Sequence, residues 1–155
     1  MTSTDMRSPS QQAILKGALL SGAINGVING TIQFWLLRGS DVIPLSVDSI
    51  SAGTPTVLGS AVPLAVSLAM ISTAVAHWTL KGPKKPFFPT TLWLLLKHGV
   101  FAFGALVAAA VVWQRSFGTV DVSLAGAVVL LGLIAAIVST AVNYMTISEI
   151  VPDQP

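Results

Sequence analysis

Residues 122–148 read VSLAGAVVLLGLIAAIVSTAVNYMTIS, a long stretch without a single charged side chain. Three more stretches resemble it, at 17–37, 54–80 and 91–114, the last interrupted only by Lys97. At a rise of about 1.5 Å per residue, each can cross a hydrocarbon core about 30 Å thick. A backbone inside a bilayer must satisfy its own hydrogen bonds, so these stretches predict helices and not strands.

The sequence therefore predicts an all-α integral membrane protein in which four transmembrane helices form a small polytopic bundle, a single membrane domain over residues 1–155. The predicted spans are 13–37, 55–80, 91–114 and 122–147. Thr54, Thr90 and Asp121 are the predicted N-caps of the second, third and fourth spans. Pro63 should bend the second span, because it removes a backbone donor and frees the carbonyl of Gly59.

Composition supports this class. Of 155 residues, 53% are hydrophobic and only 9% are charged, and there is no cysteine. A soluble domain carries about 25% charged residues. The balance excludes a disordered chain, a disulfide scaffold and a nucleic-acid-binding protein.

The positions of Lys and Arg predict the orientation. The N-terminal tail, the second loop and the residues beside them hold six of the eight cations: Arg7, Lys16, Lys81, Lys84, Lys85 and Lys97. By the positive-inside rule, both termini then face the cytoplasm. The expected location is the cell membrane, as a multi-pass protein, and the inner membrane if the cell is Gram-negative.

The first span has the most informative pattern. Two sets of residues recur in steps of four, the glycines Gly22, Gly26 and Gly30 and the polar residues Ser21, Asn25, Asn29 and Gln33. On a helical wheel both sets occupy roughly one half of the helix, and bulky apolar residues occupy the other half. The bulky half is expected to face lipid, since an unpaired amide in hydrocarbon costs several kcal/mol.

Two interpretations of the polar half remain open. In the structural one, the glycines form a close seam with another helix and the asparagines hydrogen-bond across it. In the functional one, the amides line a polar path and replace the hydration shell of a small solute. The two interpretations can hold together.

Other helices offer partners for this half. Gly132, Ala136, Ser139 and Asn143 fall on one narrow face of the fourth span. In the second span, Ser60, Pro63, Ser67 and Ala74 share a face. Ser67, Ser139 and Asn143 are therefore candidate path or substrate-binding residues together with Ser21, Asn25, Asn29 and Gln33. The alternative for each is that small residues only permit close packing.

Ionisable groups gather at the predicted cytoplasmic end. His77, Lys97 and His98 should lie at similar depths and form a polar cluster that could bind an anion. Lys97 can instead extend its ammonium to the headgroups, and His77 can have an interfacial structural role. His98 is too short to reach as far and is the better candidate for an interior role.

Several functions lack the residues they need. The six carboxylates, Asp5, Asp41, Asp48, Asp121, Glu149 and Asp153, all fall outside the middle of the spans. This disfavours proton-coupled export through an embedded carboxylate. Two histidines without cysteine make a poor metal set, and no catalytic triad or phosphate loop is recognisable. The sequence predicts no enzyme, no metal and no cofactor.

In size and number of spans the chain is similar to small four-helix drug exporters and small fluoride channels. It lacks the glutamate embedded in the first helix of the exporters and the motifs of the fluoride channels. The likeness implies architecture alone.

We therefore expect a channel or permease-type transport component, with Asn25, Asn29 and Gln33 on the path. The alternative is an accessory or assembly subunit of a larger membrane complex that docks through the Gly22, Gly26 and Gly30 face. Expected partners are membrane lipids, further copies of the chain or a larger complex, and a small ion or polar solute.

Overall fold

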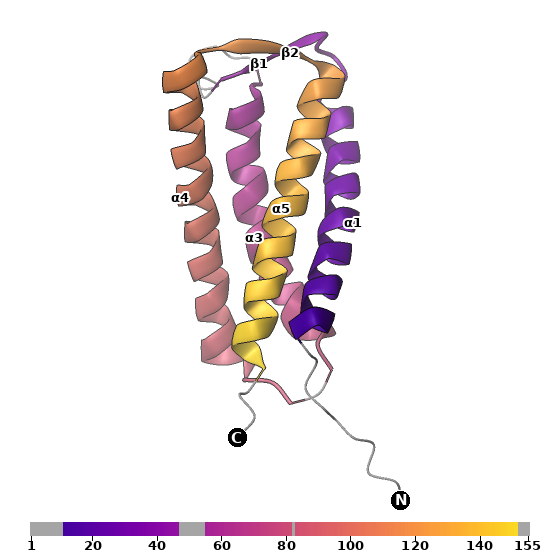
Figure 1. The fold of residues 1–155 in the computed structure, drawn as a ribbon, viewed down its shortest axis with the longest axis vertical. Helices are drawn as coiled ribbons and strands as arrows, with labels where there is room; N and C mark the ends of the chain where they lie inside the picture. The colour runs from indigo at the N-terminus through magenta and orange to yellow at the C-terminus, as the bar shows by residue number, and fades with distance from the viewer. Residues whose placement is uncertain (1–10, 47–54, 82, 152–155) are drawn as a thin grey trace, which may run out of the picture.

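The computed structural model describes residues 11–46, 55–81 and 83–151, and four long helices dominate this part of the chain (Figure 1). The elements are α1 (Gln11–Leu37), β1 (Val42–Leu45), α3 (Val57–Thr79), η1 (Phe87–Thr91), α4 (Leu92–Phe117), β2 (Val120–Ser123) and α5 (Leu124–Ile150). The element η1 is one π-helical turn that leads directly into α4.

Three helices are long and apolar enough to cross a membrane. They are α3, the continuous Phe87–Phe117 helix made by η1 and α4, and α5. The all-helical prediction and three of its four spans are thus confirmed. The helix α1 is as long as α5 but is not among the three, because Ser21, Asn25, Asn29 and Gln33 lower its hydropathy.

The observed starts of the helices differ from the predicted caps. Thr56 caps α3, with Oγ1 accepting from the Gly59 N–H at 3.1 Å, and Ser123 caps α5 by accepting from the Gly126 N–H at 3.2 Å. Asp121 is not a cap, since it pairs with Pro44 in a two-stranded sheet and is extended. Thr90 lies inside the π-helical turn. The predicted cap Thr54 falls outside the described residues.

The helices pack in the order α1, α5, α3, α4. The helix α5 lies between α1 and α3, and α4 packs mainly against α3 and makes few contacts with α5. The start of α1 and the end of α5 lie at one end of the bundle, and the two strands lie at the other (Figure 1). We call the first end the terminal end and the second the strand end.

The strand end is closed by an antiparallel pair. The strand β1 pairs with β2 in the register Val42 with Ser123 through Leu45 with Val120. Ile43 and Leu45 are buried with Leu37, Val57 and Leu131 in one apolar cluster. The pair thereby joins the α1–α3 connection to the α4–α5 connection.

Candidate functional site

The glycines of α1 lie against α5. A Cβ atom at Gly22 would overlap with Thr140, and a Cβ atom at Gly26 would lie 2.9 Å from the Cβ atom of Ala136. At the facing position on α5, a Cβ atom at Gly132 would lie 3.1 Å from the carbonyl oxygen of Gly26. Gly30 is buried at the same contact, with more room around it. The two backbones therefore approach closely because neither helix has bulky side chains there.

A polar chain crosses three helices beside this seam. The Asn25 amide on α1 donates to Ser139 Oγ on α5 at 2.7 Å. The Ser139 hydroxyl is 3.3 Å from the hydroxyl of Ser72 on α3. Ser72 and Ser139 are both buried. We call Asn25, Ser139 and Ser72 the polar chain.

The other polar residues of α1 differ in their surroundings. Ser21 is 3.5 Å from the Asn25 amide nitrogen and lies at the margin of the polar chain. The Asn29 amide donates to the backbone oxygen of Asn25 at 2.9 Å, within its own helix. Gln33 is 7% exposed, one turn beyond Asn29 toward the strand end. The predicted stripe is thus continuous along α1, but it reaches another helix through Asn25.

Two further candidates lie apart from each other. Asn143 is buried on α5, one turn from Ser139. Ser67 is exposed on α3 and donates to the backbone oxygen of Pro63 at 2.8 Å. The structure therefore does not bring Ser67 to the polar chain, because the face of α3 that carries Ser67 points away from α5.

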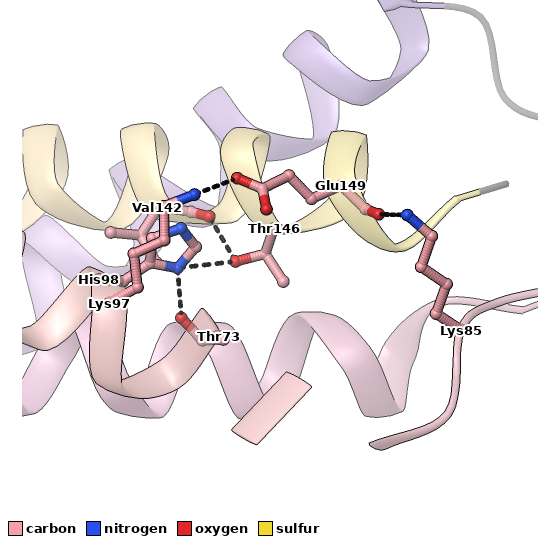
Figure 2. Close-up of polar contacts among 7 residues, drawn as sticks. All are labelled: Thr73, Lys85, Lys97, His98, Val142, Thr146 and Glu149. Carbon is pink, nitrogen blue, oxygen red and sulfur yellow. Dashed lines mark hydrogen bonds and ion pairs between the residues drawn. The ribbon is translucent and has the colours of Figure 1, made fainter. Parts of the chain in front are cut away.

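A second polar group lies between α3, α4 and α5 (Figure 2). His98, 1% exposed, has its Nδ1 3.0 Å from Thr73 Oγ1 on α3 and 3.4 Å from Thr146 Oγ1 on α5. Both threonine hydroxyls donate to carbonyls of their own helices, Thr73 to Ala69 at 2.8 Å and Thr146 to Val142 at 2.7 Å. We call His98, Thr73 and Thr146 the histidine cluster.

His77 and Lys97, predicted to join His98, have separate partners. His77 is buried, and its Nδ1 lies 2.8 Å from Thr91 Oγ1. Lys97 forms an ion pair with Glu149 on α5 at 2.9 Å, with both side chains about half exposed. The three residues share one end of the bundle without meeting in a single pocket.

Lysines of the α3–η1 connection cap helix ends. Lys84 Nζ donates to the carbonyls of His77 and Leu80 at the end of α3, and Lys85 Nζ donates to the Glu149 carbonyl at 2.8 Å near the end of α5. Cations at these carbonyls favourably complement the helix dipole. Two of the cations used to predict orientation therefore also have structural partners.

Ser72, Thr73, Thr146 and Glu149 were missed by sequence reasoning. In α3 and α5, a serine or threonine alone is a weak signal because its hydroxyl can bond to its own helix. A helical wheel does place Ser139, Asn143 and Thr146 on one side of α5. That alignment could have drawn attention to Thr146, but not to its partner His98.

Two grooves in the described part of the bundle are lined mainly by apolar residues. A groove of about 510 Å³ runs between α1 and α5, lined by residues such as Gly26, Val27, Phe34, Val129 and Leu133. A smaller one lies between α3 and α4, beside Pro63 and Val107. Neither groove is lined by the polar chain or by the histidine cluster.

Replacing Ser139 with alanine is expected to destabilise the protein by about 0.6–2 kcal/mol, because the Asn25 amide and Ser72 both lose a buried partner. The measurement is equilibrium unfolding of the purified protein in mixed micelles. Ser67→Ala is the matched control, since it removes the same hydroxyl from the exposed side of α3 and should have little effect. Equal losses in the two variants would contradict the role of Ser139.

Comparison of the chain with models of known protein families, with curated protein sequences and with solved structures gives no match.

Proposed function

We propose that this protein is a small transport component of the channel or permease type. The observation that carries the proposal is the polar chain, in which an amide and two hydroxyls from three helices meet between apolar helices. Polar groups inside a membrane bundle are costly and commonly mark the pathway of a solute. The protein would then transport a small ion or polar molecule without acting as an enzyme.

The proposal includes α1 as a fourth span. Its 27 residues extend about 40 Å and pack along α5, which is itself apolar enough to cross a membrane. Large apolar side chains such as Leu20, Ile24 and Ile28 are exposed on its outer side and would suit lipid. An edge helix of this kind can carry amides because their side of the helix faces α5.

The proposed orientation has the terminal end in the cytoplasm. Lys81, Lys84 and Lys85 lie in the connection at that end, and Lys97 lies in the first turns of α4. The positive-inside rule then places this end on the cytoplasmic side of the cell membrane, which is the inner membrane in a Gram-negative cell.

The proposed path follows Ser21, Asn25, Asn29 and Gln33 along α1 and includes Ser139 and Asn143 on α5. Passage would require α1 and α5 to separate, since Asn25 now donates directly to Ser139. Association of several copies would supply additional polar surface around such an opening. Outward-facing apolar residues on α1 and α4, among them Trp35 and Phe101, are available for contacts between copies.

The test is flux through purified protein in liposomes, with potassium, chloride and urea as probes. We expect flux of at least one probe above that of protein-free vesicles. The double variant Asn25→Ala, Asn29→Ala should reduce it to the protein-free level. Thr31→Val is the matched control, because it removes a hydroxyl from the exposed side of α1. Its flux should equal that of the wild type.

Two results would overturn the proposal. One is absence of flux for all three probes in wild-type vesicles, and the other is wild-type flux in the double variant. Either result would favour the second candidate function, an accessory subunit of a larger membrane complex.

The exposed apolar side of α1 favours that second candidate. Gly22, Gly26 and Gly30 pack on α5 of the same chain, so a partner would contact the outer side of α1. A photoreactive residue at Leu20 should then cross-link to one defined membrane protein in cells. A photoreactive residue introduced at Val100, which is exposed on α4, is the control and should not cross-link to that protein.

A further inference from the structure

His98 is the most deeply buried ionisable side chain in the described part of the bundle. Its residue is 1% exposed, and it sits between α3, α4 and α5 at about two turns from the start of α4 (Figure 2). Its Nδ1 contacts Thr73 and Thr146, but its Nε2 is buried without a hydrogen-bond partner among the described residues. Buried polar atoms are normally paired, so this atom requires an explanation.

The surrounding hydrogen bonds define which nitrogen carries the proton. Thr73 Oγ1 and Thr146 Oγ1 each donate their single proton to a backbone carbonyl. Toward His98 both hydroxyls can only accept, so Nδ1 must be the N–H donor, shared between them. In the neutral ring, Nε2 then has a free lone pair.

We propose that Nε2 of His98 is a proton-binding site inside the bundle. A proton transferred from hydronium breaks one O–H bond there and releases water, and it forms a new N–H bond at Nε2 that converts the neutral ring to an imidazolium. Imidazole is the side chain that changes charge between about pH 5 and 8. The inference goes beyond transport, because it concerns proton binding by the chain whether or not a solute moves.

A proton can bind at Nε2 without an adjoining cavity. The apolar grooves between α1 and α5 and between α3 and α4 are lined by residues other than His98. A proton needs no cavity, whereas a water needs room and two or more polar partners. The hydroxyls of Thr73 and Thr146 contact Nδ1, so they do not serve as partners for a water at Nε2.

A countercharge stands near the site. The ionisable groups of the packed elements, besides His98 itself, are His77 on α3, Lys97 and the distant Arg115 on α4, and Tyr144 and Glu149 on α5. Of these, Glu149 is the carboxylate and lies one turn beyond Thr146, paired with the residue that precedes His98 (Figure 2). Lys97 is half exposed and can return to water or headgroups.

Proton binding should therefore redistribute this ion pair. A charged ring at His98 would attract Glu149 away from Lys97, since a buried charge gains most from an unscreened partner. Because α4 makes few other contacts with α5, the change would alter the connection between these two helices. The Lys97–Glu149 pair and His98 thus form a proton-dependent link between α4 and α5.

The test is nitrogen NMR of the full chain labelled at histidine, in lipid bilayers, as a function of pH. At high pH we expect a single His98 tautomer, with the proton at Nδ1 and Nε2 bare. As the pH falls, Nε2 should become protonated. His98→Gln assigns the signals by removing them, and His77 serves as the internal control.

Variants test the countercharge. Glu149→Gln should lower the ratio of charged to neutral His98 at a fixed pH by about two- to fivefold, and Lys97→Gln should raise it. The proposal is overturned if wild-type His98 has its proton at Nε2 at high pH. It is equally overturned if Nε2 stays bare down to pH 4, as a bound water or an inert buried ring would give. The wild-type titration decides even where a variant does not fold.

Discussion

Replacing Gly26 with leucine is expected to separate α1 from α5. A Cβ atom at this position would lie 2.9 Å from the Ala136 Cβ and 3.0 Å from the Gly132 carbonyl oxygen, so even the first side-chain carbon is too close. A leucine adds three more carbons, and overpacking of this kind costs about 1–3 kcal/mol. The helix α1 would lose contact with α5, its main partner in the bundle.

Cross-linking measures this separation. The protein has no cysteine, so a pair of introduced cysteines reports on one contact. We place them at Asn25 and Ser139, whose Nδ2 and Oγ atoms are 2.7 Å apart. Oxidation should link them efficiently in an otherwise unchanged chain and poorly when Gly26→Leu is added. Gly17→Leu is the matched control on the same helix, because no atom lies within 4 Å of a Cβ atom there. Equal linking in both leucine variants would show that the seam tolerates bulk.

The long helices could be predicted because charged residues bound the apolar stretches that can cross a membrane. Asp41 and Lys81 lie outside the helices, whereas Arg115 lies in the last turn of α4, so the predicted helix positions are close to those observed. The caps were less predictable, because threonine and serine are frequent near these ends. Only the strand pairing explains why α5 starts after Ser123 and not after Asp121.

The polar side of α1 was predictable, but its partners were not. Steps of four place Gly22, Gly26 and Asn25 on one half of a helix without knowledge of any neighbour. Which helix meets that half depends on packing between segments more than a hundred residues apart. The hydrogen bond from Asn25 to Ser139 therefore appeared only with the fold.

The histidine cluster shows the same limit more clearly. The sequence indicates an interior role for His98, since its side chain is too short to reach the membrane surface from its position. It does not indicate that Thr73 and Thr146 converge on one nitrogen and leave the other unpaired. Ser67, which shares predicted helical periodicity with other small residues, lies on the exposed side instead.

Replacing Ile43 with alanine is expected to destabilise the strand end by about 2–5 kcal/mol. Ile43 is fully buried in β1 and packs in the cluster with Leu37, Val57 and Leu131, which come from three different helices. Loss of its side chain leaves a cavity where the two inter-helix connections are joined. The measurement is unfolding of the purified protein in mixed micelles, followed by tryptophan fluorescence, to which Trp113 beside this cluster contributes.

Val42→Ala is the matched control for this prediction. Val42 is the preceding residue of the same strand and is 57% exposed, so its side chain points away from the cluster. Because both variants shorten a β-branched side chain in β1, any loss of strand propensity is common to them. A surface change of this kind alters stability by about 0.5 kcal/mol or less. A difference between the variants then measures burial at the strand end, and similar losses would mean that the sheet does not help to hold the helices together.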